Sequence, residues 1–261
     1  MLVHGSWVDC RVWDEVAPLL RRSFEVVAYD RRGHGLSTCP PGQGSVHEDV
    51  DDLAALIDLL GAGPVHVAGA SFGGSIALRL AAGRPDALLS IAVHEPPLFD
   101  LVDGRAVEPC ELTELRAHLS SVAARLEAGD LEGGARLYFD RVAQSPGGWA
   151  GLDLARRRAL VETAPTYLDH YRDPDALRID LGDLAAFDGP ALVTYGDRRP
   201  PFFRRMAEMV SAALPAARSE LIPGTAHDPQ VTHPGAYTRA IEELASRRAA
   251  GRSAMPAKPK P

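Results

Sequence analysis

The chain has 261 residues, which suits one large α/β domain or two small ones, and 46% of its residues are hydrophobic, enough for a sizeable core. Its net charge of -7 excludes general nucleic-acid binding, because that function needs a basic face. No apolar run approaches the roughly 20 residues that span a membrane, and no signal-peptide pattern opens the chain. Three widely spaced cysteines form no Cys-x-x-Cys pair. They indicate a reducing compartment without a disulfide or zinc framework, so we expect a cytoplasmic protein that has no membrane partner.

The first hundred residues alternate between expected strands and helices. Short apolar runs bounded by turn residues predict strands over 24–29, 64–68 and 88–93. Residues 46–60 place apolar side chains on one face and acidic ones towards the N-terminal end, which predicts an amphipathic helix. A second helix is predicted over 71–82. Strands that alternate with helices predict a parallel sheet covered on both faces.

The pattern changes after about residue 100. Residues 100–188 show helical periodicity without a convincing strand, and they predict helices over 111–129, 131–144 and 154–171. The strand pattern resumes at 191–195 and 219–222, with helices over 203–214 and 234–249. We therefore expect a core built from 1–99 and 189–250, a helical cap or lid over 100–188, and a disordered tail, rich in Pro and Lys, over 251–261.

The most informative motif is Gly69-Ala70-Ser71-Phe72-Gly73, which has the form Gly-x-Ser-x-Gly. It stands between an expected strand and an expected helix, the setting in which this motif forms a nucleophile elbow. The glycines remove Cβ clashes, so Ser71 can adopt a strained backbone conformation with an exposed hydroxyl. The alternative is an ordinary turn that happens to contain a serine. The setting favours Ser71 as a catalytic nucleophile.

A serine hydroxyl needs a base, and the base needs an acidic partner that fixes its tautomer. His227 lies in a polar loop directly after the last short strand, and we predict that it is the base. Asp197 follows the strand 191–195, and we predict that it is the acid, giving the chain order Ser…Asp…His. Glu95 competes for the acid role, because it ends the strand that follows the nucleophile helix. Each residue also has a structural interpretation: His227 as a surface histidine, Asp197 as a turn residue, and Glu95 as a residue that shapes the Pro96-Pro97 turn.

The reaction also needs an oxyanion hole. The backbone N–H of Phe72, directly after the nucleophile, is one expected donor. The loop His4-Gly5-Ser6-Trp7 is placed to supply the second, and we expect it from the N–H of Ser6. Trp7 is a candidate wall of the substrate pocket, although packing in the core is an equally good interpretation of a large aromatic side chain.

No cofactor or metal is predicted. The remaining histidines are interpreted as structural, and no His-Glu-x-x-His or similar metal spacing occurs. Neither Gly-x-Gly-x-x-Gly nor Gly-x-x-x-x-Gly-Lys-Ser/Thr occurs, so a nucleotide cofactor has no support.

Several ordered motifs together resemble the α/β-hydrolase superfamily, in particular small bacterial esterase-like serine hydrolases with a helical cap. The resemblance runs from about residue 1 to 248 and is weakest over 100–188. It implies the α/β-hydrolase fold. By this resemblance His4-Gly5-Ser6-Trp7 is the oxyanion loop, residues 29–37 form a structural turn, and residues 69–74 form the nucleophile elbow. Glu95-Pro96-Pro97 is the turn entering the cap, Gly196-Asp197 carries the acid, and residues 224–227 carry the base.

The chain departs from that family at its start. Only three residues precede His4-Gly5, whereas family members usually carry further strands there, so the N-terminal strands are expected to be missing. Three residues are fewer than the about five of an ordinary strand. An exposed sheet edge would result, and we expect low stability or self-association, for example as a homodimer.

The predicted function is a serine hydrolase that cleaves an ester, lactone or thioester of a small-molecule substrate with a partly apolar group. The resemblance also covers C–C bond hydrolases and cofactor-free perhydrolases or haloperoxidase-like enzymes, which keep a similar triad. A serine at position 71 argues against epoxide hydrolases and haloalkane dehalogenases of this fold, which use aspartate there. A ligand-binding or biosynthetic accessory protein of the same fold is the alternative from another class.

Overall fold

The computed structural model describes residues 1–103, 109–143 and 148–253, and in this part of the chain five parallel strands form one sheet. The order β1-β2-β3-β4-β5 follows the sequence. Because each neighbouring pair is parallel, the carboxyl ends of the strands lie along one edge, where sheets of this kind bind their ligands. The strands are β1 (Leu2–Val3), β2 (Val65–Ala70), β3 (Leu88–His94), β4 (Ala191–Gly196) and β5 (Ala217–Ile222).

Helices cover both faces of the sheet, as the alternation of strands and helices predicts. Side chains alternate along β2, so Val67 belongs to the apolar cluster on the face that carries α2, α3 and α7, while Ala68 belongs to the cluster on the face that carries α1 and α9. The same alternation in β3 and β4 places one apolar core on each face. The helices of the core are α1 (Ala17–Leu20), α2 (Val46–Leu60), α3 (Phe72–Gly83), α7 (Pro201–Ala213), α8 (Pro229–Thr232) and α9 (Pro234–Ser253).

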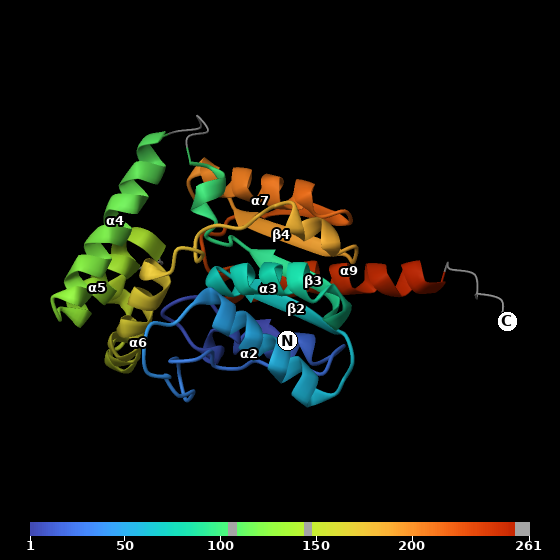
Figure 1. Cartoon of the computed structure of the whole chain (residues 1–261), viewed down its shortest axis with the longest axis horizontal. Coiled ribbons are helices and arrows are strands. Elements are labelled where there is room, and N and C mark those ends of the chain that lie inside the picture. Colours follow the sequence, from blue (N-terminus) through green and yellow to red (C-terminus); the bar gives the residue numbers. More distant parts are fainter. Residues whose placement is uncertain (104–108, 144–147, 254–261) are drawn as a thin grey trace.

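A group of helices between β3 and β4 lies at the carboxyl end of the strands, to the left in Figure 1. We call the described residues from Pro109 to Arg172 the helical insertion. Its buried side chains belong to the same apolar cluster as the face of the sheet that carries α3, so the insertion is packed onto the core. It consists of α4 (Pro109–Glu127), α5 (Leu131–Leu137), the π-helical turn η4 (Tyr138–Ala143), the 3₁₀ turn η5 (Trp149–Gly151) and α6 (Leu154–Arg172).

The helix predicted over 46–60 is confirmed with those bounds as α2, and its ends show why. Ser45 and Glu48 form a capping box, in which the Ser45 hydroxyl accepts from the Glu48 N–H and the Glu48 carboxylate accepts from the Ser45 N–H at 2.9 Å. Asp49 adds a second carboxylate to the first turn, where the helix dipole favours it. Gly61 ends the helix in the left-handed conformation, with φ 61°.

The strand predicted over 24–29 is wrong. This segment makes only an isolated bridge, Leu2 to Ala28, supported by the Leu2 N–H donating to the Val27 carbonyl at 2.8 Å. Strand β1 has two residues, and on this side only Leu2 forms a bridge, whereas both residues pair with β2. β1 is therefore an edge strand of the described sheet, and the remainder of 24–29 runs beside it without strand pairing.

The other predicted elements appear with shifts of one to two residues at most ends. The helix predicted over 131–144 is instead α5 followed by η4, and residue 144 lies outside the described residues. α9 continues to Ser253, so residues 251–253 are helical rather than part of a tail, while the rest of the predicted tail lies outside the described residues. None of the helices in the described ranges has the length and apolar character that a membrane crossing requires.

Candidate active site

Ser71 stands at the turn between β2 and α3, at the carboxyl edge of the sheet. Its backbone has φ 53° and ψ -124°, a conformation that side-chain-bearing residues rarely adopt. Two glycines make the turn possible. A Cβ on Gly69 would overlap the carbonyl of Gly73, and a Cβ on Gly73 would overlap the carbonyl of Val3. The elbow that the sequence predicts is thus a tight, strained turn, of the kind that presents a nucleophile.

His227 lies in the loop between β5 and α8, and its acidic partner is Glu95. The His227 Nδ1–H donates to Glu95 Oε2 at 2.7 Å, a short distance typical of a charge-assisted hydrogen bond. Glu95 follows β3 directly and its side chain is fully buried, whereas 12% of the His227 side chain is exposed. With Nδ1 protonated, the Nε2 of the neutral His227 ring is the atom left to accept a proton.

The Glu95 carboxylate is held as an anion. Its Oε1 accepts from the Gly196 N–H at 3.0 Å, and the Arg199 Nε lies 3.4 Å from Oε2. Burial opposes the charge, but the neighbouring His94, the hydrogen bond from His227 and the Arg199 guanidinium together hold the pKa of Glu95 at about 2. Glu95 also has a positive φ of 42°, a strained conformation like that of Ser71. The carboxylate is therefore ionised and fixed against the histidine.

Asp197, the predicted acid, is placed elsewhere. Its carboxylate is exposed and accepts from the Gly224 N–H at 2.8 Å, so it ties the end of β4 to the loop that carries His227. The structure thus corrects the predicted pairing of His227 with Asp197 to a pairing with Glu95. The reason is geometric: β3 lies between β2 and β4, so the end of β3 is the nearer neighbour of the elbow on β2.

The expected oxyanion-hole donors flank Ser71. Within the described residues, neither the Ser6 N–H nor the Phe72 N–H donates to a protein acceptor. Phe72 is the first residue of α3, where the helix dipole also favours negative charge. Gly5 lets the Ser6 loop come close, because a Cβ at position 5 would lie 3.0 Å from the Ser71 Cβ.

Two cavities meet at the candidate triad. The narrow cavity, about 60 Å³, is mostly apolar and includes Leu119, Tyr138 and Tyr167 of the helical insertion in its lining. The wide cavity, about 240 Å³, lies between the Ser6 loop, the insertion and α8. Ser71 and His227 line both, so a substrate bound across them would place one part in each cavity.

Trp7 supports the narrow cavity from behind instead of lining it. Its side chain is buried and stacks on the Tyr138 ring at 4.9 Å, with the Tyr167 ring 5.5 Å away. Trp7 has a positive φ of 68°, the third such non-glycine position besides Ser71 and Glu95 in the described chain. Strain thus gathers at the candidate site, as it does at functional sites generally.

Sequence reasoning missed two residues at this site. Arg199 was not singled out, and His170 was interpreted as structural although it lines the narrow cavity from α6. No local signal marks either residue, because each acquires its partners only through contacts between segments far apart in the sequence.

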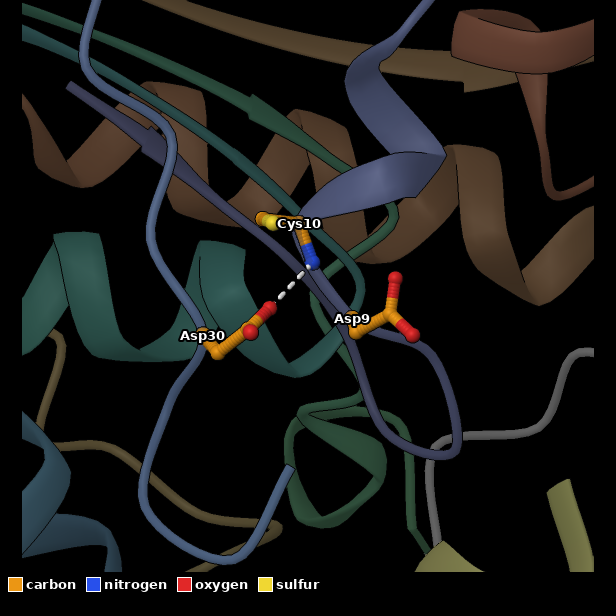
Figure 2. A group of neighbouring side chains, drawn as sticks. All are labelled: Asp9, Cys10 and Asp30. Carbon is orange, nitrogen blue, oxygen red and sulfur yellow. Dashed lines mark hydrogen bonds between the residues drawn. The ribbon is translucent and has the colours of Figure 1, made fainter. Parts of the chain in front are cut away.

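A separate group of Asp9, Cys10 and Asp30 brings potential metal ligands together (Figure 2). Its oxygens already accept hydrogen bonds within the fold: Asp30 from the N–H groups of Cys10 and Leu36, both at 2.8 Å, and Asp9 from Arg11. Burial raises the pKa of the Cys10 thiol to about 12, so in the metal-free protein the sulfur carries its proton. The group is best explained as a hydrogen-bonded loop junction.

Comparison with known proteins shows which proteins the chain is similar to. A family model described as the alpha/beta hydrolase family matches residues 1–240. The chain is 32% identical over 157 residues to lipase LipV of Mycobacterium tuberculosis, a match that covers 59% of this chain and 52% of LipV, about half of that protein's length. It is 27% identical over 255 residues to a pimeloyl-[acyl-carrier protein] methyl ester esterase of Pectobacterium carotovorum, covering 92% of this chain and 91% of that protein. The structure of a thermophilic esterase from Thermogutta terrifontis matches with a TM-score of 0.72 at 24% identity, over 95% of this chain and 89% of that one, which is a likeness of fold.

Proposed function

Because the chain belongs to the alpha/beta hydrolase family, we propose that it is a serine hydrolase that cleaves a carboxylic ester, lactone or thioester through Ser71, His227 and Glu95. The observation that carries the proposal is the 2.7 Å hydrogen bond from His227 Nδ1–H to the buried Glu95, beside a strained serine that lines the same cavities as His227. Nucleophile, base and acid then each have a position that fits their role.

In the proposed mechanism, His227 Nε2 takes the proton of the Ser71 hydroxyl while the Ser71 Oγ attacks the substrate carbonyl carbon. The imidazolium that forms is stabilised by the Glu95 carboxylate, which remains ionised because its pKa lies near 2. The negative oxygen of the tetrahedral intermediate is held by the N–H groups of Ser6 and Phe72. Each such donor contributes on the order of 10²–10³-fold to kcat.

Collapse of the intermediate breaks the bond between the carbonyl carbon and the leaving group. His227 gives its proton to the leaving alcohol or thiol, and an acyl group remains on Ser71. A water molecule then gives a proton to His227 Nε2 and attacks the acyl carbon. The bond from that carbon to the Ser71 Oγ breaks, Ser71 takes the proton back from His227, and the acid leaves. In this account one histidine acts as base and then as acid in each half of the reaction.

The cavities suggest how a substrate would lie. An apolar acyl group fits the narrow cavity, where its walls are aromatic and aliphatic, and the leaving group fits the wider cavity. The helical insertion would then act as the cap predicted for 100–188, because it closes the narrow cavity over Ser71. The esterase and lipase names among the relatives support ester hydrolysis, and they do not fix this chain's substrate.

The experiment is a series of p-nitrophenyl esters from acetate to octanoate, assayed with the wild-type protein and Ser71→Ala. We expect turnover that is fastest with short acyl chains, because the narrow cavity is small, and a loss of at least about 10³-fold in Ser71→Ala. Equal turnover by both proteins would refute the proposal. A well-folded wild-type protein that cleaves no ester, lactone or thioester would favour a C–C bond hydrolase, a perhydrolase or a non-hydrolytic binding protein.

A further inference from the structure

His170 lies on α6 of the helical insertion and contacts both residues of the proposed oxyanion hole. Its side chain is buried and lines the narrow cavity. The ring Nδ1 lies 3.1 Å from the Ser6 Oγ, and the ring stacks on the Phe72 side chain with 3.8 Å between centroids and 21° between planes. Ser6 lies in the loop after β1 and Phe72 is the first residue of α3, so one side chain of the insertion bridges the two halves of the hole.

The hydrogen bonds of His170 fix which ring nitrogen carries the proton. An Arg31 guanidinium nitrogen lies 3.1 Å from Nε2, and arginine can only donate. Nε2 must therefore accept, which leaves the proton of the neutral ring on Nδ1, and Nδ1–H donates to the Ser6 Oγ. Burial and the nearby Arg31 charge lower the pKa of His170 well below its usual value, so the ring stays neutral.

Arg31 completes the arrangement. Its side chain is fully buried and pairs with Asp49 of α2 at 3.3 Å, and its guanidinium carbon lies 4.9 Å from the centre of the Phe72 ring. Arg31 thus holds His170 from one side and contacts Phe72 at the same time. The orientation of the histidine is set by a charged group anchored in the core.

A second contact from α6 holds the same loop. The Thr163 hydroxyl lies 3.2 Å from the Trp7 carbonyl oxygen, one residue beyond Ser6, and shares its single proton between this oxygen and the carbonyls of Ala159 and Leu160 in its own helix. The Ser6 loop is therefore fastened to the helical insertion through a side chain and through its backbone. Any movement of α6 away from the core would break both contacts.

We propose that His170 is a positioning residue that fixes the spacing of the Ser6 and Phe72 N–H groups, so that the oxyanion hole is assembled only when the helical insertion is seated on the core. This inference rests on the proposed serine hydrolase function. Oxyanion donors act when they lie 2.7–3.1 Å from the developing charge, so a small displacement of either N–H weakens catalysis. The insertion then contributes to the rate of the reaction as well as to the shape of the substrate cavity.

Two substitutions remove the same hydrogen bond from opposite ends. His170→Phe keeps an aromatic ring on Phe72 and loses both ring nitrogens. Ser6→Ala loses the hydroxyl and keeps the backbone N–H. For hydrolysis of p-nitrophenyl acetate we expect each to lower kcat by about 10- to 100-fold, less than the loss of a whole oxyanion donor, with KM changed by less than about 3-fold.

The double variant and a rescue variant separate positioning from general damage. If His170 acts through the Ser6 hydroxyl, the double variant, which carries both His170→Phe and Ser6→Ala, should have a kcat no lower than that of the slower single variant. His170→Asn places an amide N–H near the position of Nδ1 and should recover part of kcat. His118→Phe, at a histidine of α4 outside both cavities, is the matched control and should keep the wild-type kcat.

The outcomes are distinct. An unchanged kcat in folded His170→Phe and Ser6→Ala, a change in KM alone, or additive losses in the double variant would overturn this inference while leaving the hydrolase intact. If His170→Phe does not fold by circular dichroism, Ser6→Ala alone decides. A folded wild-type protein that neither cleaves the ester nor reacts with a fluorophosphonate at Ser71 would refute the proposed function, and this inference with it.

Discussion

Replacing the Glu95 carboxylate with an amide tests which acidic side chain orients His227. In Glu95→Gln the amide oxygen must face the Gly196 N–H, since that backbone group can only donate. The amide NH₂ then faces His227 Nδ1, where Glu95 Oε2 now accepts at 2.7 Å. His227 is forced into the tautomer with its proton on Nε2, and in that form it cannot accept the proton of Ser71.

The size of the effect follows from that tautomer. The corresponding change from acid to amide in a serine-protease triad lowers kcat by about 10⁴-fold, which is about 5.5 kcal/mol in the activation barrier. Asp197→Asn keeps an oxygen that can accept from the Gly224 N–H, and the side chain is exposed. We therefore expect Asp197→Asn to retain activity within about 5-fold, a contrast of roughly three orders of magnitude between the two variants.

Both variants are assayed for kcat on the best p-nitrophenyl ester and for folding by thermal unfolding. Glu95→Gln leaves Arg199 without its buried anion, a loss that costs on the order of 3–5 kcal/mol, so the assay is run below the measured Tm. A proton NMR signal from the His227 Nδ1–H should vanish in Glu95→Gln and persist in Asp197→Asn. A larger loss in Asp197→Asn than in Glu95→Gln would refute the reasoning and return the acid role to Asp197.

Three further predictions concern stability and assembly. Burial lowers the pKa of His4, His34, His94 and His170, to about 3 for His34 and about 4 for His94, so below about pH 6.5 these side chains bind protons in the unfolded chain and not in the folded protein. The unfolding free energy should therefore fall by about 1.4 kcal/mol per pH unit for each of them as the pH is lowered. A Tm that stays flat from pH 7 to 5 would contradict this prediction. Gly73→Ala should cost about 1–3 kcal/mol and lower kcat, because its Cβ overlaps the Val3 carbonyl. Gly83→Ala at the end of the same helix meets no atom within 4 Å and should raise the unfolding free energy measured in urea by up to about 1 kcal/mol, because alanine favours the helix. The self-association expected from the sequence would require a second copy to displace the segment 24–29 from beside the buried strand β1, and size-exclusion chromatography that shows only a stable, high-melting monomer would exclude it.

The sequence predicted those parts of the fold that depend on local signals. The amphipathic pattern of residues 46–60 and the Gly-x-Ser-x-Gly elbow are both contained in short continuous segments, and the helix and the turn are found where they were expected. The segment 24–29 has the composition of a strand, but its pairing depends on the length of β1, a partner that the segment does not specify. Composition shows that a segment can form a strand, and only the tertiary structure shows whether a neighbour is available.

The residues of the candidate site also fall into two groups, those with a local sequence signal and those without one. Ser71 and His227 were predicted because each lies in a motif with a local shape. The choice between Glu95 and Asp197 could not be made from the sequence, since both follow strands that end at the same edge of the sheet. It depends on the loop after β5, which brings His227 to Glu95, 132 residues away. His170 and Ser6 are 164 residues apart, so their contact left no sequence pattern to detect.

The central claim, that Ser71 is the activated nucleophile, is tested most directly by reaction with a fluorophosphonate followed by mass spectrometry of the intact protein and its peptides. We expect one adduct per chain, located on Ser71, formed rapidly by the wild type and absent from folded Ser71→Ala. An adduct on another residue, or no adduct on a folded wild-type protein, would contradict it.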